Sequence, residues 1–140
     1  MAKAADGEHP ATAARNGLFV IPRRSGGGFQ GIIRGHLLEL ADPDSHGLAP
    51  TPDDLFVTSL ASQLAWSTRT FLQANGLPDE VSVSATWLRR GDLPALTDVS
   101  LTVTVSSYAE AATATLAANF ANSLVAQFQD APVIQVSSQE

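Results

Sequence analysis

The sequence predicts an α+β fold in which an antiparallel sheet packs against two helices, one of them long and central. Two kinds of hydrophobic period support this prediction. Apolar residues recur at three-and-four spacing between Pro52 and Asn75, as expected of an amphipathic helix. Strict alternation of apolar and polar residues at 81–87 and 99–105 is typical of strands that bury one face. With the flanking segments, the expected order of elements is β-β-α-β-β-α-β.

The first strands are expected near the N-terminus. Residues 18–21 form a short apolar run that is closed by a proline, which predicts a strand. A glycine-rich turn follows, and Phe29–Leu40 is expected to return as one second strand of a hairpin. Because the alternation in this segment is imperfect, a β-bulge at Gly31 or Gly35 is expected.

The long helix has clear signals at both ends. Thr51–Asp54 combines an N-cap, a proline at the first helical position and two acids that face the positive end of the helix dipole. Asn75-Gly76, followed by Pro78, predicts the C-terminal end. The predicted apolar stripe between these ends comprises Val57, Leu60, Ala61, Leu64, Thr68, Phe71 and Leu72.

Two strands, a second helix and a short last strand are expected after the long helix. Ser107 and Glu110 have the spacing of a capping box and predict the start of an alanine-rich helix that continues to Phe128. Pro132 ends this helix, and Val133–Val136 is expected to be the last strand. The side chains expected to face the core from the two alternating strands are Val81, Val83, Ala85 and Trp87, and Val99, Leu101, Val103 and Val105.

Composition excludes several classes of function. The chain has 140 residues, 44% of them hydrophobic, no cysteine and a formal net charge of −6. A nucleic-acid partner is not expected, because such a protein needs a basic face. Residues 1–16 lack the apolar core of a signal peptide and are expected to form a flexible tail, with a single domain at 17–140. No segment approaches a membrane span, so we expect a cytoplasmic protein without a membrane partner.

The segment Thr51–Trp66, TPDDLFVTSLASQLAW, resembles the start of the central helix in the OsmC/Ohr family of osmotically induced and organic-hydroperoxide-resistance proteins. The continuation Asn75–Pro78, the strand that ends in Trp87 and the alanine-rich second helix resemble the same family. The resemblance covers about residues 17–136 and implies an OsmC-like fold, an intertwined homodimer and a role in stress response.

In that family, a peroxidatic cysteine and a resolving cysteine carry out peroxide reduction. The resemblance places these two cysteines at Gln63 and Ser123 of this chain. It also implies an activating arginine, at Arg23 or Arg24, and a carboxylate from the first helix turn, at Asp53 or Asp54. The reaction requires a thiolate that becomes a sulfenic acid and a second thiol that captures it. Because the chain has neither thiol, thiol-dependent peroxidase activity is excluded.

Each of these positions has a functional and a structural interpretation. The Gln63 amide either orients a ligand or is satisfied within helix packing or at a dimer interface. Ser123 is expected to be inert, because no base is placed to activate it. The two arginines either hold an anionic group, or pair with Asp53, or form a solvated turn.

No cofactor is expected. His9, His36 and His46 lack the spacing of metal ligands, and both tryptophans, Trp66 and Trp87, are expected in the core or an interface.

The sequence therefore favours a non-catalytic OsmC-like protein. Such a protein would bind a small, largely apolar molecule or a partner protein in a pocket between the two helices, near Gln63 and Ser123. Two alternatives remain open: an enzyme that uses cysteine-independent chemistry in the same pocket, and a purely structural dimer whose pocket is filled.

Overall fold

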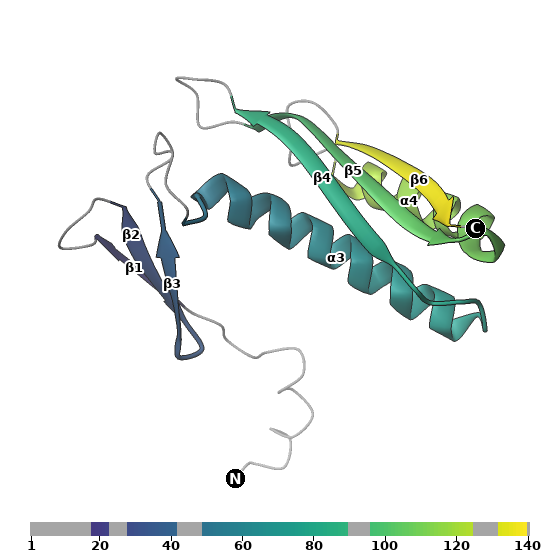
Figure 1. Ribbon diagram of the computed structural model, residues 1–140, viewed down its shortest axis with the longest axis horizontal. Coiled ribbons are helices and arrows are strands. Elements are labelled where there is room, and N and C mark those ends of the chain that lie inside the picture. Colours follow the sequence, from purple (N-terminus) through teal and green to yellow (C-terminus); the bar gives the residue numbers. More distant parts are fainter. Residues whose placement is uncertain (1–17, 23–27, 42–48, 90–95, 125–131, 140) are drawn as a thin grey trace, which may run out of the picture. The chain divides into compact units, whose positions relative to one another are not determined.

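A computed structural model of the chain describes residues 18–22, 28–41, 49–89, 96–124 and 132–139. It divides into two compact units, Met1–Pro52 and Asp53–Glu140, whose elements are labelled in Figure 1. Each unit is built around its own three-stranded sheet. No helix in the described part of the chain has the length and apolarity needed to span a membrane.

The first unit contains strands β1 (Leu18–Pro22), β2 (Phe29–Ile33) and β3 (His36–Leu40), paired antiparallel in that order. The single strand predicted for 29–40 was therefore wrong. Arg34 and Gly35 have φ values of 49° and 78° and make a two-residue turn between β2 and β3. Positive φ at both central residues is the requirement of a type I′ hairpin, which matches the twist of the strands. The expected bulge is absent, because Gly31 pairs regularly with Val20 and Leu38.

The sheet of the first unit leaves apolar side chains exposed on both of its faces. Side chains alternate between faces along a strand, and directly paired residues share a face. A three-stranded sheet with two apolar faces cannot bury both faces by itself, so these faces need covering by other parts of the protein or by another chain. On one face the exposed residues are Leu18, Val20, Phe29, Ile33 and Leu38, and on the other they are Ile21, Ile32 and Leu37.

The second unit has a mixed sheet with the strand order β4-β5-β6. Strands β4 (Ser82–Arg89) and β5 (Leu96–Ser106) are antiparallel, whereas β6 (Val133–Gln139) pairs parallel to β5. The expectation of a purely antiparallel sheet was therefore wrong for the last strand. A helix lies between β5 and β6, and such a crossover returns the chain in the same direction.

The predicted alternation in β4 and β5 is confirmed. Val99, Leu101, Val103 and Val105 are each at most 4% exposed, whereas the residues between them are only half-buried. The register aligns Val103 with Val83 of β4 and with Val136 of β6, so one apolar face extends across all three strands.

Helix α3 (Pro52–Ala74) packs its predicted stripe against this apolar face. Leu64, Thr68 and Leu72 are fully buried, and Figure 1 shows the helix running alongside β4. The C-terminal end is a Schellman motif, in which the Leu77 and Gly76 amides donate to the carbonyl oxygens of Leu72 and Gln73. Gly76 has a φ of 66°, a conformation that glycine adopts without strain.

The second helical segment begins one residue earlier than the sequence suggested. A short 3₁₀ turn, η1 (Ser107–Ala109), leads into α4 (Glu110–Leu124). Its N-cap is Ser106, whose hydroxyl accepts from the Tyr108 amide at 3.3 Å, so the capping box expected at Ser107 was wrong. The core cluster includes Ala109 and, packed against it, Phe120, so both helical segments contribute to one core. Phe128 lies outside the described residues.

Two core threonines have unpaired hydroxyls. Thr68 of α3 and Thr113 of α4 are both 0% exposed, and among the described residues neither Oγ1 atom has a hydrogen-bond partner. Burying an unpaired hydroxyl is unfavourable, and valine has the same shape without this group. We therefore expect Thr68→Val and Thr113→Val each to raise the free energy of unfolding by about 1 kcal/mol, as measured by urea denaturation.

Thr58→Val is the matched control on α3, because the Thr58 hydroxyl is exposed and donates to the Asp54 carbonyl oxygen at 2.7 Å. This variant should lower the stability or leave it unchanged. Destabilisation by Thr68→Val as large as that of a cavity-forming mutation would contradict the prediction.

A polar cluster holds the segment between α3 and β4. Gln73 Nε2 donates to Asp79 Oδ2 at 2.7 Å, and Arg69 Nε lies 3.5 Å from the same oxygen. The Gln73 hydrogen bond is the main cause that lowers the pKa of Asp79, and Arg69 adds to it. A carboxyl whose pKa is lower in the folded state stabilises the fold above its unfolded pKa, and this stabilisation disappears as the pH falls.

Asp79→Asn should therefore be less stable than the wild type at pH 7. The difference should shrink as the pH falls below about 4, the ordinary pKa of aspartate. Thermal unfolding of both proteins across this range measures the effect, and a difference that stays constant with pH would contradict it.

Candidate functional site

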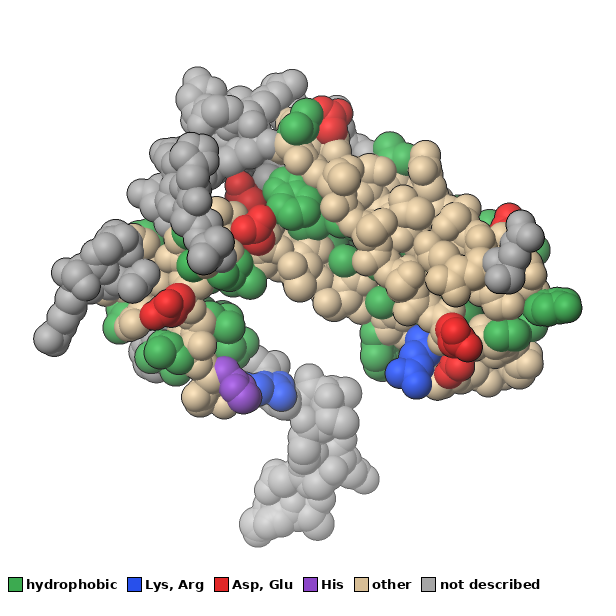
Figure 2. Space-filling model, in the orientation of Figure 1, with side chains coloured by type: hydrophobic (Ala, Val, Ile, Leu, Met, Phe, Trp, Pro, Cys, Tyr) green, Lys and Arg blue, Asp and Glu red, His purple; other side chains and the backbone are tan. Residues whose placement is uncertain are grey.

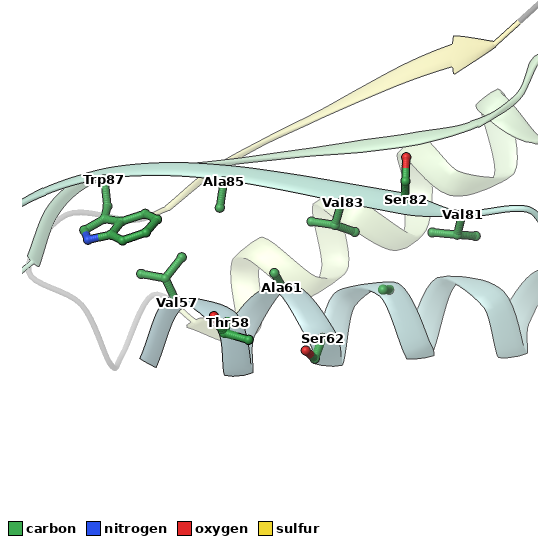
Figure 3. Close-up of a pocket in the computed structure, with 10 residues that line it drawn as sticks. Val57, Thr58, Ala61, Ser62, Val81, Ser82, Val83, Ala85 and Trp87 are labelled. Atoms are coloured by element: carbon green, nitrogen blue, oxygen red, sulfur yellow. The ribbon is translucent and has the colours of Figure 1, made fainter. Parts of the chain in front are cut away.

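A groove of about 420 Å³ lies between α3 and β4 in the second unit. Figure 3 shows side chains from the helix and the strand pointing toward one another across it, with Trp87 at one end and Val81 at the other. The residues that line the groove are Val57, Thr58, Ala61, Ser62, Ala65, Val81, Ser82, Val83, Ala85 and Trp87.

The groove follows from the position of β4 and from the size of the helix residues. Because β4 is an edge strand, no further strand of its own sheet covers this flank of α3. The helix places small residues here at intervals of four, Thr58 with Ser62 and Ala61 with Ala65. Such pairs lie one above the other on the same side of a helix. Their short side chains leave open the space that larger residues would fill.

The chemistry of the groove is apolar and uncharged. Its floor consists of valine and alanine side chains and the Trp87 ring, and none of the lining residues is ionisable at neutral pH. Hydroxyl groups come from Thr58 and Ser62 of α3, but the Thr58 hydroxyl is already donated within the helix. Ser82 lines the groove at its backbone, because its hydroxyl points to the other face of β4 (Figure 3). Hydroxyls and an indole N–H can hydrogen-bond a neutral ligand, whereas a charged ligand would lose its hydration without a countercharge.

Gln63 does not line the groove. Its side chain is exposed, and at 100° per residue it projects about 200° around the helix from both Ala61 and Ala65. It shares this outer side of α3 with Phe56 and Trp66, which are 44% and 71% exposed. The amide is therefore on the surface of the unit rather than at the floor of an apolar cleft.

The other predicted residues are described only in part. Ser123 is exposed on α4, and its hydroxyl donates to the Phe120 carbonyl oxygen at 2.6 Å, a bond within its own helix. Asp53 is half-buried in the first turn of α3 and is not without a partner. Arg23 and Arg24 lie outside the described residues. The meeting of these residues in one pocket stays a prediction.

The described part of the chain contains no group of three or more histidine or acidic side chains arranged to hold a metal ion. The groove lining also offers no base beside a hydroxyl, which nucleophilic catalysis requires.

The apolar side chains that line the groove from α3 and β4, other than Ala65, were predicted from sequence to face the core. Alternation correctly predicted that Val81, Val83, Ala85 and Trp87 face inward, but not that they are only half-buried. The available signal was the set of small residues on one flank of α3, Thr58, Ala61, Ser62 and Ala65. The sequence did not indicate that the strand beside this flank is at the edge of its sheet.

Comparison with known proteins identifies the fold. No family model and no curated protein matches the chain. Among solved structures, an OsmC-like protein from Mycoplasma pneumoniae has a TM-score of 0.70 and 12% identity, covering 92% of this chain and 100% of its own. An organic hydroperoxide resistance protein from Elizabethkingia anophelis has a TM-score of 0.68 and 12% identity, covering 91% and 99%. The protein OhrB from Bacillus subtilis has a TM-score of 0.56 and 11% identity, covering 89% and 98%.

At these identities the likeness shows the fold alone. The expected α+β class and the resemblance to OsmC/Ohr proteins are confirmed at that level.

Proposed function

We propose that this OsmC-like chain is a non-catalytic, cytoplasmic binding protein that holds a small, uncharged and largely apolar molecule in the α3–β4 groove. The observation that carries the proposal is the groove itself. Its volume of about 420 Å³ lies within the range of small-molecule sites, and its lining has the usual composition of apolar walls with a few polar groups.

A binding role is better supported than catalysis. The chain has no cysteine, so the redox reaction of organic hydroperoxide resistance proteins is not open to it. Cysteine-independent chemistry would need an ionisable group at the site, and the groove lining has none. Gln63, the position that the family resemblance assigns to the first cysteine, lies on the opposite side of α3 from the groove, so the proposed site is not at that position.

A homodimer is the second part of the proposal. The sheet of the first unit has exposed apolar side chains on both faces, and α3 carries the exposed rings of Phe56 and Trp66 on its outer side. Apolar surface of this extent on more than one element marks an interaction surface. A second copy of the chain is the partner that the OsmC-like fold favours.

The binding site can be tested with Trp87 as the reporter. The chain has two tryptophans, so Trp66→Phe leaves Trp87 alone at the end of the groove. Titration of this variant with the neutral dye N-phenyl-1-naphthylamine should change Trp87 emission and dye fluorescence together. Ala61→Leu fills the groove and should weaken dye binding at least tenfold.

Ala118→Leu makes the same change at an exposed position of α4 and should bind the dye as the parent does. Equal affinity in all three proteins would place the dye elsewhere and overturn the proposed site. A dye that fails to bind the parent would favour the purely structural alternative.

The dimer can be tested independently of the ligand. Light scattering at micromolar concentration should give twice the mass of one chain, and Trp66→Asp should shift the population toward the monomer because it places a charge on the outer side of α3. Ser84→Asp, on an exposed hydroxyl-rich surface, is the charge-matched control and should stay dimeric. A wild-type monomer at this concentration would contradict the dimer but not the groove.

A further inference from the structure

The face of the β4-β5-β6 sheet that points away from the helices is polar but uncharged. Strand register places its side chains in rows across the three strands. Figure 2 shows this part of the second unit as a broad tan area with few charged or hydrophobic side chains. The rows are Ser82–Thr104–Ser137, Ser84–Thr102–Gln135 and, at the far end, Thr86–Ser100–Val133.

This polar face ends in two adjoining hollows of about 150 and about 190 Å³. Both hollows are lined by Glu80 and Gln139. Ser82 and Thr104 line the first, and Ser106 lines the second. Hydroxyl and amide groups from the three strands therefore converge at one corner of the sheet with the carboxylate of Glu80, which precedes β4.

Several of these polar groups are available to a ligand. Among the described residues, no hydrogen bond or ion pair engages the side chains of Glu80, Gln139 and Ser82. The Thr104 and Ser137 hydroxyls are 2.9 Å apart and bond to each other, which orients that row. The corner thus presents carboxylate acceptors and an amide that both donates and accepts.

An exposed aromatic residue follows the same corner in the chain. Tyr108 is 82% exposed, and its amide donates to Ser106, whose side chain lines the second hollow. A tyrosine exposed to this degree presents a large apolar ring together with a hydroxyl. Apolar rings pack against the C–H face of a sugar, while amide and carboxylate groups bond to its hydroxyls.

We propose that this corner, lined by Glu80, Gln139 and Ser106, binds a neutral carbohydrate with the help of Tyr108, which follows Ser106 by two residues, and that the hydroxyl rows of the sheet extend the site along a longer chain. An uncharged, hydroxyl-rich surface has paired donors and acceptors for a neutral polyol and lacks the charges that a phosphate or an acidic sugar needs. The alternative ligand is a cationic amine, which would rely on the Glu80 carboxylate and the Tyr108 ring. The many uncharged hydrogen-bonding groups favour the carbohydrate. The proposal does not depend on ligand binding in the groove, whose lining side chains Val83, Ala85 and Trp87 belong to the opposite face of β4; the groove shares only Val81 and Ser82 with the first hollow.

The test is an NMR titration of the full-length protein with three probes, cellohexaose, maltohexaose and chitohexaose. At least one probe should shift the backbone amide resonances around Glu80, Ser106, Tyr108 and Gln139 in a saturable manner. Gln139→Ala and Tyr108→Ala should each weaken that binding about tenfold. Gln63→Ala makes the same change at an exposed position of α3, away from this face of the sheet, and should leave the binding unchanged.

Two further measurements make the proposal falsifiable. Glu80→Gln keeps hydrogen-bonding capacity without the charge, so it should retain sugar binding within a few fold. A parallel titration with spermidine tests whether the corner binds a cationic amine instead. Absence of shifts with all three sugars at millimolar concentration overturns the proposal, as do shifts that Gln139→Ala and Tyr108→Ala leave unaffected. Saturable spermidine binding at these residues that Glu80→Gln abolishes, with no sugar binding, overturns it in favour of the amine.

Discussion

The packing of α3 on the apolar face of β4-β5-β6 is the contact on which the second unit depends. Leu64 and Leu72 are fully excluded from water, and the sheet residues Leu101 and Val103 that share their cluster are too. Full burial of each such side chain contributes about 1.5–3 kcal/mol, so this layer supplies much of the stability of the unit. This packing also divides the surface of α3 into three parts that differ in how far they are buried.

The three parts follow from the angle of each residue around the helix axis. One stripe is buried in the core, and the flank beside edge strand β4 carries small residues and becomes the groove. The outer side carries Phe56, Gln63 and Trp66 and is left uncovered by the helix's own sheet. A three-stranded sheet is too narrow to cover more than the first stripe. The open groove and the exposed aromatic side therefore have the same cause.

The spacing of apolar residues along the sequence was enough to predict most elements of the fold. The boundaries of α3 and the inward faces of β4 and β5 came directly from spacing, because period and end signals are properties of neighbouring residues. The turn at Arg34-Gly35 was missed because arginine rarely adopts positive φ, so an Arg-Gly pair is a weak turn signal. The parallel pairing of β6 was missed because strand direction depends on the connection through α4 rather than on the strand residues themselves.

The site was harder to predict than the fold, since it depends on which distant segments become neighbours. The resemblance to a known family predicted a pocket near Gln63 and Ser123, whereas the groove lies between the flank of α3 and β4. Neither the small residues of α3 nor the alternation of β4 indicates a cavity by itself. Only the place of β4 at the sheet edge leaves the space between them open.

The core of the second unit is independent of the two positions that the family resemblance assigns to cysteines. Gln63 and Ser123 are both exposed, and neither belongs to the core cluster around Leu64 and Leu101. Replacing a reactive group at either position changes no core contact, so it costs little stability. The residues that specify the fold face the sheet, whereas the two positions that the family resemblance assigns to cysteines face outward. The packing of this core therefore places no constraint on which residue occupies either position, and a shared fold does not require shared chemistry.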